Sequence, residues 1–134
     1  MNSAPVIFIV DDDPVFQTLL NIGISHIDLP KEVKLFNNGK EALKYLDDAP
    51  EHDVLVFLDL NMPIMNGWEF LEELQSKDYQ KRVLIVITST STLANDKTRA
   101  FQYQQVLFYK EKPLNVALVK CLVEDIFEVY YVGR

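Results

Sequence analysis

Short apolar runs alternate five times along the chain with longer segments in which apolar residues recur every three or four positions. The short runs, such as VIFIV at 6–10, are rich in β-branched and aromatic residues, which is typical of strands. The longer segments have the spacing of amphipathic helices. The pattern predicts strands over residues 6–10, 32–39, 53–60, 82–91 and 106–115. It predicts helices over residues 14–27, 39–49, 66–77, 92–103 and 115–132.

This alternation of strands and helices favours an α/β fold. Buried strands that are separated by helices pair in parallel, with helices on both faces of the sheet. Right-handed crossovers then give a doubly wound, flavodoxin-like arrangement of five parallel strands in the order 2-1-3-4-5. The sequence contains no linker, repeat or low-complexity stretch, so we expect residues 1–134 to form a single domain with no output domain.

Four packing expectations follow from the helical segments. Asp13 is expected to cap the first helix, with Pro14 at its first position, where proline has no hydrogen bond to lose. Cys121 and Trp68 are expected to be buried in the core. The residues expected on the buried face of the first helix are Val15, Leu19, Ile22 and Ile27.

Composition narrows the class of protein. The chain has 134 residues, 49% of them hydrophobic and 25% charged, as in a globular protein. Its apolar runs are far shorter than the ~20 residues of a membrane span, and the N-terminus does not resemble a secretory signal. We therefore expect a cytoplasmic protein without membrane contact. The net charge of −7 argues against a nucleic acid partner, because phosphates are bound with Lys and Arg.

The candidate chemistry stands where the expected strands end. In an open parallel sheet, sites form outside the carboxyl ends of the strands, at the crevice where the winding reverses. Here that crevice lies between the first and third strands. The side chains expected to meet there are Asp11 and Asp12 from the first strand, Asp59 from the third, Thr88 from the fourth and Lys112 from the fifth.

Three neighbouring carboxylates require a cation. A hard divalent ion with oxygen ligands, Mg²⁺, suits them, and Lys112 adds one positive charge. A metal on one side and an ammonium on the other suit a phosphoryl group. Asp59 is then expected to be the nucleophile that accepts it, because a carboxylate can form an aspartyl-phosphate.

At this point the sequence resembles the receiver domains of two-component response regulators, including the single-domain chemotaxis type. The resemblance rests on four motifs: VDDD at 10–13, DLNMPIMNGWEF at 59–70, ITS at 87–89 and EKP at 111–113. All four occur in order, at the ends of successive expected strands.

The resemblance implies a role for each matching residue. It makes Asp59 the phosphoryl acceptor, with Asp11, Asp12, Asp59 and the backbone carbonyl of Asn61 holding Mg²⁺. It makes Lys112 the contact to the phosphoryl oxygens, Thr88 the switch hydroxyl and Tyr109 the aromatic that follows it. It also implies a cis peptide bond between Lys112 and Pro113.

The resulting hypothesis is a signalling switch rather than a metabolic enzyme, catalysing only its own phosphorylation and dephosphorylation. A sensor histidine kinase or phosphotransfer protein would supply the phosphoryl group, and an unknown downstream protein would read the result. One alternative is an aspartyl-nucleophile phosphohydrolase, but Asn61 stands where a general acid would be needed. The other is a flavin protein, but the TSTST run at 88–92 lacks glycine and follows the fourth strand.

Overall fold

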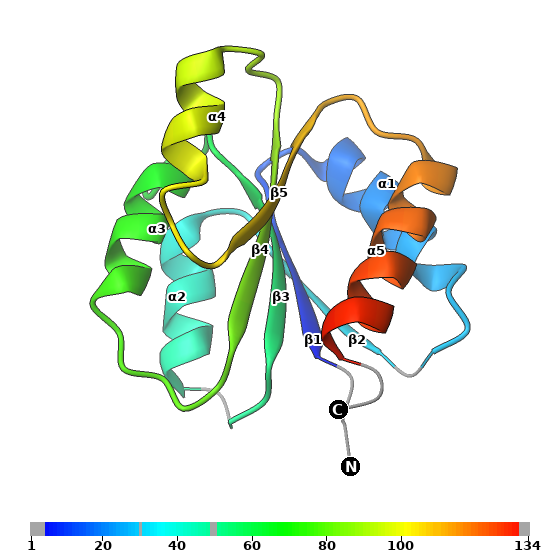
Figure 1. Cartoon of the computed structure of the whole chain (residues 1–134), viewed down its shortest axis with the longest axis horizontal. Helices are drawn as coiled ribbons and strands as arrows, with labels where there is room; N and C mark the ends of the chain where they lie inside the picture. Colours follow the sequence, from blue (N-terminus) through cyan, green and yellow to red (C-terminus); the bar gives the residue numbers. More distant parts are fainter. Residues whose placement is uncertain (1–4, 30, 49–50, 132–134) are drawn as a thin grey trace.

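A five-stranded parallel sheet organises the chain, as seen in Figure 1. The computed structural model describes residues 5–29, 31–48 and 51–131. Its strands are β1 (Val6–Val10), β2 (Glu32–Phe36), β3 (Val54–Asp59), β4 (Val83–Ser89) and β5 (Val106–Glu111). Its helices are α1 (Pro14–Ser25), α2 (Gly39–Asp48), α3 (Gly67–Gln75), α4 (Ala94–Ala100) and α5 (Val116–Tyr130).

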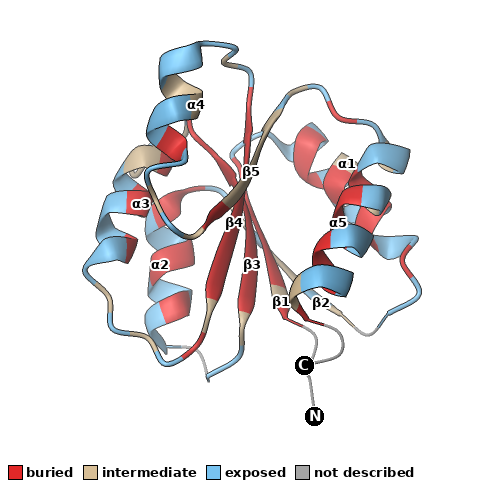
Figure 2. Cartoon of the chain, in the orientation of Figure 1, coloured by how far each residue is buried: buried red, intermediate tan, exposed pale blue. Residues whose placement is uncertain are grey.

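The strand order is β2-β1-β3-β4-β5, which confirms the predicted topology. Helices α1 and α5 cover one face of the sheet, and α2, α3 and α4 cover the other (Figure 1). Every residue of β3 and β4 is buried, because these strands lie inside the sheet and between two helical layers (Figure 2). Alternate side chains therefore feed two cores, with Phe57 in one and Leu58 in the other.

The strand register places the strand ends side by side. Val10, the last residue of β1, pairs with Phe36 on one side and Leu58 on the other. Asp59 is the ladder partner of Thr88. The residues that follow β1 thus emerge beside the end of β3, at the crevice that the topology predicts.

Helix α1 is rotated relative to the sequence prediction. The prediction was wrong for Val15 and Ile22, which are 76% and 45% exposed. The buried face is instead built on Phe16, Leu20 and Ile24, which follow one another at intervals of four residues. The register is fixed by α5: a Cβ on Gly23 would lie 2.7 Å from Cγ1 of Val119, so only glycine allows this close approach.

Two further core predictions need correction. Cys121 is exposed, because the buried stripe of α5 runs through Val119, Leu122, Val123, Ile126 and Phe127 and passes it by. Trp68 is only half-buried, and its ring lies 4.0 Å from the guanidinium of Arg99.

Most of the predicted helix ends lie within two residues of the observed ones. The Asp13 side chain accepts from the N–H of Val15 and caps α1 as expected. The fourth helix is shorter than predicted and comprises only Ala94–Ala100. The predicted ends of two helices, at residues 49 and 132, lie outside the described residues. None of the helices within the described ranges combines the length and apolar character that crossing a bilayer requires.

Candidate functional site

Three carboxylates from two strand ends meet at the crevice. Asp11 and Asp12 follow β1, and Asp59 is the last residue of β3. One carboxylate oxygen from each lies within 4.8 Å of the others. Asp11 and Asp59 are buried, whereas Asp12 is exposed, so the cluster is open to solvent on one side.

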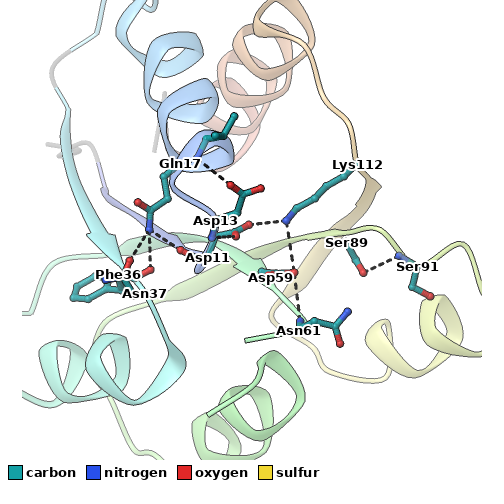
Figure 3. Close-up of polar contacts among 11 residues, drawn as sticks. Asp11, Asp13, Gln17, Phe36, Asn37, Asp59, Asn61, Ser89, Ser91 and Lys112 are labelled. Carbon is teal, nitrogen blue, oxygen red and sulfur yellow. Dashed lines mark hydrogen bonds and ion pairs between the residues drawn. The ribbon is translucent and has the colours of Figure 1, made fainter. Parts of the chain in front are cut away.

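Lys112 brings a single ammonium group into this cluster from the segment after β5 (Figure 3). Its Nζ lies 2.8 Å from Oδ2 of Asp11 and 3.7 Å from Oδ1 of Asp59. The ammonium also lies 4.3 Å from the centre of the Phe16 ring. The backbone N–H of Lys112 donates to the backbone carbonyl of Ser89 at 2.7 Å. The bond to Pro113 is cis, as expected.

The cluster holds more negative than positive charge, and the pKa values of its buried carboxyl groups are raised. Burial, and after it the charge of Asp11, raise the pKa of Asp59 from 3.8 to about 6. Burial also raises the pKa of Asp11, although its hydrogen bond from Lys112 acts in the opposite direction. Lys112 alone therefore leaves the site short of positive charge.

A hydroxyl and an aromatic ring border the site along β4 and β5. Thr88, the ladder partner of Asp59, is buried, and its Oγ1 has no hydrogen-bond partner within the described residues. A buried hydroxyl without a partner is uncommon and needs an explanation. The Tyr109 hydroxyl donates to the carbonyl of Ser91 at 3.0 Å, so Tyr109 is tied to the loop after β4.

The loop between β3 and α3 wraps closely around Asp59. The N–H of Asn61 donates to Oδ1 of Asp59 at 3.3 Å. A Cβ on Gly67 would lie 2.5 Å from the carbonyl oxygen of Asp59, so this glycine is required by close approach. Within the loop, Ile64 has a positive φ of 69°, and the N–H of Met65 donates to the carbonyl of Pro63 at 2.7 Å. These features describe a strained γ-turn centred on Ile64.

The structure thus brings the candidate site residues that were expected from the sequence to one edge of the sheet. Asp11, Asp12 and Asp59 lie close to one another, and Lys112 pairs with Asp11 and Asp59. Thr88 is adjacent to Asp59 in the sheet. Asn61 reaches Asp59 through its backbone N–H, and Tyr109 lies one strand further out.

Two contributors to the site were missed by sequence reasoning. Phe16 places its ring beneath the Lys112 ammonium, and Gln17 donates to the backbone carbonyl of Asp11. The sequence analysis singled out neither of them, because both lie inside the first amphipathic helical segment. A glutamine three positions after Pro14, within a largely apolar segment, is the one signal that could have drawn attention.

The donor set fits a hard divalent cation. Three carboxylates offer oxygen atoms at a spacing that one ion can bridge, and the exposed side of Asp12 leaves room for coordinated water. Oxygen ligands and retained water are what Mg²⁺ and similar ions prefer.

Comparison with known proteins agrees with this geometry. The chain is 28% identical over 132 residues to a probable methanogenesis regulatory protein, FilR2, of Methanothrix harundinacea, covering 96% of this chain and 84% of that protein. It is 27% identical over 123 residues to a probable chemotaxis protein, CheY, of Rhizobium etli, covering 90% and 91%. The crystal structure of the phosphorylated cyanobacterial phytochrome response regulator RcpA is 30% identical, covers 96% of this chain and 94% of that one, and has a TM-score of 0.78.

The acidic pocket of Asp11, Asp12 and Asp59 is consistent with a phosphoacceptor site. The family model of the response regulator receiver domain matches residues 7–121, which is most of the sequence. The chain therefore belongs to the response regulator receiver domain family.

Proposed function

We propose that this receiver domain is a phosphoacceptor switch in which Asp59 takes the phosphoryl group. The observation that carries the proposal is the meeting of Asp59 with Asp11, Asp12 and Lys112 at one strand-end crevice. Asp59 is the acid of this cluster that still belongs to a strand, where it pairs with Thr88, and a backbone N–H and an ammonium lie near the same carboxylate oxygen.

The transfer itself needs positioned charge more than covalent chemistry. A carboxylate oxygen of Asp59 attacks the phosphorus, an O–P bond forms, and the bond from phosphorus to the donor's nitrogen breaks. The electron pair stays on the donor's imidazole. Lys112 would balance the negative charge of the phosphoryl oxygens. A bound Mg²⁺, held by Asp11, Asp12, Asp59 and the carbonyl of Asn61, would neutralise further charge on those oxygens.

The change of state would pass through Thr88. Its buried hydroxyl has no hydrogen-bond partner in the described part of the chain, so an acceptor arriving on Asp59 would satisfy it. Movement of Thr88 toward Asp59 would free space beside Tyr109, whose hydroxyl bond to Ser91 would then be exchanged. Such a switch requires two states that differ by only a few kcal/mol.

The partners of the switch are proteins. We propose that a sensor histidine kinase or phosphotransfer protein donates the phosphoryl group and that a downstream protein binds the modified domain. The chain spans 84% and 91% of the length of the two curated relatives described above. The likeness to these relatives supports an output through protein binding, and a cytoplasmic location suits such donors.

Intact-mass spectrometry tests the proposal. The protein is incubated with acetyl phosphate, with MgCl₂ or with EDTA, beside the variant Asp59→Asn. We expect the wild type to gain the mass of one phosphoryl group only with MgCl₂, and the variant to gain none. Equal labelling of both proteins, or labelling of the wild type in EDTA, would reject the assignment.

A further inference from the structure

Gln17 is a buried polar residue that the proposed chemistry does not use. It lies on the inner side of α1 between Phe16 and Leu20 and is 8% exposed. A buried primary amide is costly unless it is hydrogen-bonded, so an apolar residue would be the simpler choice at this position.

The two N–H groups of the Gln17 amide face three acceptors from two strand ends, all within hydrogen-bond distance, as Figure 3 shows. Its Nε2 lies 2.5 Å from the carbonyl oxygen of Asp11, 3.3 Å from that of Phe36 and 3.2 Å from Oδ1 of Asn37. All three partners accept, so the nitrogen side of the amide must face them. One side chain of α1 thus joins the turn after β1 to the turn after β2.

The first of these bonds acts directly on the acidic pair. The Asp11 carbonyl belongs to the peptide unit that joins Asp11 to Asp12, and a peptide unit is rigid and planar. Holding that carbonyl fixes the direction in which the chain leaves toward Asp12. Both acids lie beyond Val10, the last paired residue of β1, so regular strand pairing no longer fixes them.

Within the described part of the chain, Asp11 has three further contacts: Lys112 donates to Oδ2 of its carboxylate at 2.8 Å, and two hydrogen bonds involve the backbone of the turn. The Asp11 N–H donates to the Phe36 carbonyl at 3.0 Å, and the Asp13 N–H donates to Oδ1 of Asp11 at 2.9 Å. The first of these two bonds fixes the backbone N–H of Asp11, and the second lies within the turn itself; neither involves the Asp11 carbonyl. Among the described side chains, Gln17 is the one that holds the Asp11 carbonyl.

We propose that Gln17 is a positioning residue for the divalent cation, acting through the Asp11–Asp12 peptide unit. This inference rests on the proposed function, because the cation is the one assigned there to Asp11, Asp12 and Asp59. Groups that orient metal ligands without touching the metal typically change its affinity by about 10- to 100-fold when they are removed.

The test compares metal affinity with stability in the full chain. MgCl₂ is titrated calorimetrically at fixed ionic strength into the wild type, Gln17→Met and Gln17→Asn. Met keeps the length of the side chain without its donor, and Asn keeps the amide but is one methylene too short. We expect both variants to bind Mg²⁺ about 10-fold more weakly, and Asn provides the measurement if Met prevents folding.

Gln75 supplies a matched control. Its amide also donates to a backbone carbonyl, that of Leu71, and to a side-chain oxygen, that of Gln105, but on α3. Gln75→Met should therefore leave the Mg²⁺ affinity within twofold of the wild type. Melting temperatures in EDTA report the structural cost of each change separately.

The outcomes separate the two proposals. Folded Gln17 variants that bind Mg²⁺ as tightly as the wild type would overturn the positioning role, even if their melting temperatures fall. A wild type that binds no Mg²⁺ would overturn the metal site itself, and with it this inference.

Discussion

The two ends of the sheet differ in how well their carboxylate groups are stabilised by neighbouring donors. At the amino end, Asp47 accepts the Tyr79 hydroxyl at 2.5 Å and the Lys77 ammonium at 3.1 Å, and the buried Lys81 donates to the carbonyl of Leu46. At the carboxyl end, three carboxylates lie close together, and the Lys112 ammonium pairs with two of them, those of Asp11 and Asp59.

The pKa values record this difference. The hydrogen bond from Tyr79 lowers the pKa of Asp47, whereas burial raises that of Asp59 to about 6. The same type of side chain is stabilised as an anion at one end and destabilised as an anion at the other. At the amino end, the charged contacts therefore stabilise the fold. At the carboxyl end, an excess of negative charge remains, which a bound cation can neutralise.

The largest expected effect comes from removing the Asp59 charge. In EDTA at pH 7.5, Asp59→Asn should raise the free energy of unfolding by up to about 3 kcal/mol, since each pKa unit corresponds to about 1.4 kcal/mol. Because the folded pKa is raised, the stability that Asp59 contributes is present below about pH 4 and is lost as the pH rises through about 6. The gain in the variant should therefore be small at pH 4. Urea unfolding at both pH values measures it.

The exposed Asp125 provides the control for this experiment. Asp125→Asn should change stability by less than about 0.5 kcal/mol at either pH. If Asp59→Asn had the same effect at pH 4 and pH 7.5, the carboxylate charge would not be the cause.

At the amino end the sign should reverse. Asp47→Asn is expected to lower the free energy of unfolding at pH 7 by about 1 to 2 kcal/mol, because the anion accepts two hydrogen bonds at the surface. The folded pKa of Asp47 is lowered, so its contribution is present above pH 4 and is lost as the pH falls below that value. Urea unfolding at pH 7 and pH 3 checks the loss.

Tyr79→Phe removes the hydroxyl that donates to Asp47, and so breaks one of the two hydrogen bonds that Asp47→Asn also affects. The double variant should lose less than the sum of the two single losses, because the changes share a contact. A stabilising Asp47→Asn would contradict the comparison between the two ends.

The smallest expected effect concerns backbone strain at the carboxyl end. Ile64 is 75% exposed, so burial does not compensate for its φ of 69°. A positive φ costs a non-glycine residue roughly 1–2 kcal/mol. Replacing it with glycine removes this cost, but part of the gain is lost because glycine has more conformational freedom in the unfolded chain. Ile64→Gly should raise the free energy of unfolding by about 0.5 to 1 kcal/mol.

Ile64→Val is the matched control, because valine keeps both the branched Cβ and the strain. Thermal unfolding of the two variants should show a rise for glycine and no change for valine. A fall with glycine would mean that the Ile64 side chain stabilises the loop.

Much of the fold could be predicted from local pattern. Strands such as β3 are continuous apolar runs that end at an acidic residue, and this pattern fixes both their position and their burial. The acids and the lysine of the site could also be named, because parallel strands deliver their last residues to one edge.

The prediction failed where two elements meet. The α1 face was misjudged because Gly23, opposite Val119, decides how that helix sits on α5. Cys121 was misjudged because several apolar residues of α5 compete for one buried stripe. The role of Gln17 could not be read from its place in the helix, since its partners lie at the ends of two different strands.

The sequence by itself determined the order of the strands and helices, the sheet topology and the identity of the residues at the strand ends. Periodicity, capping and crossover handedness are local or topological, so they are written in the chain. Only the tertiary structure decided how far each charge is buried, which carbonyl Gln17 holds and why Gly67 must lack a side chain. These depend on distances between segments far apart in sequence, and the unequal pKa values of Asp47 and Asp59 follow from them.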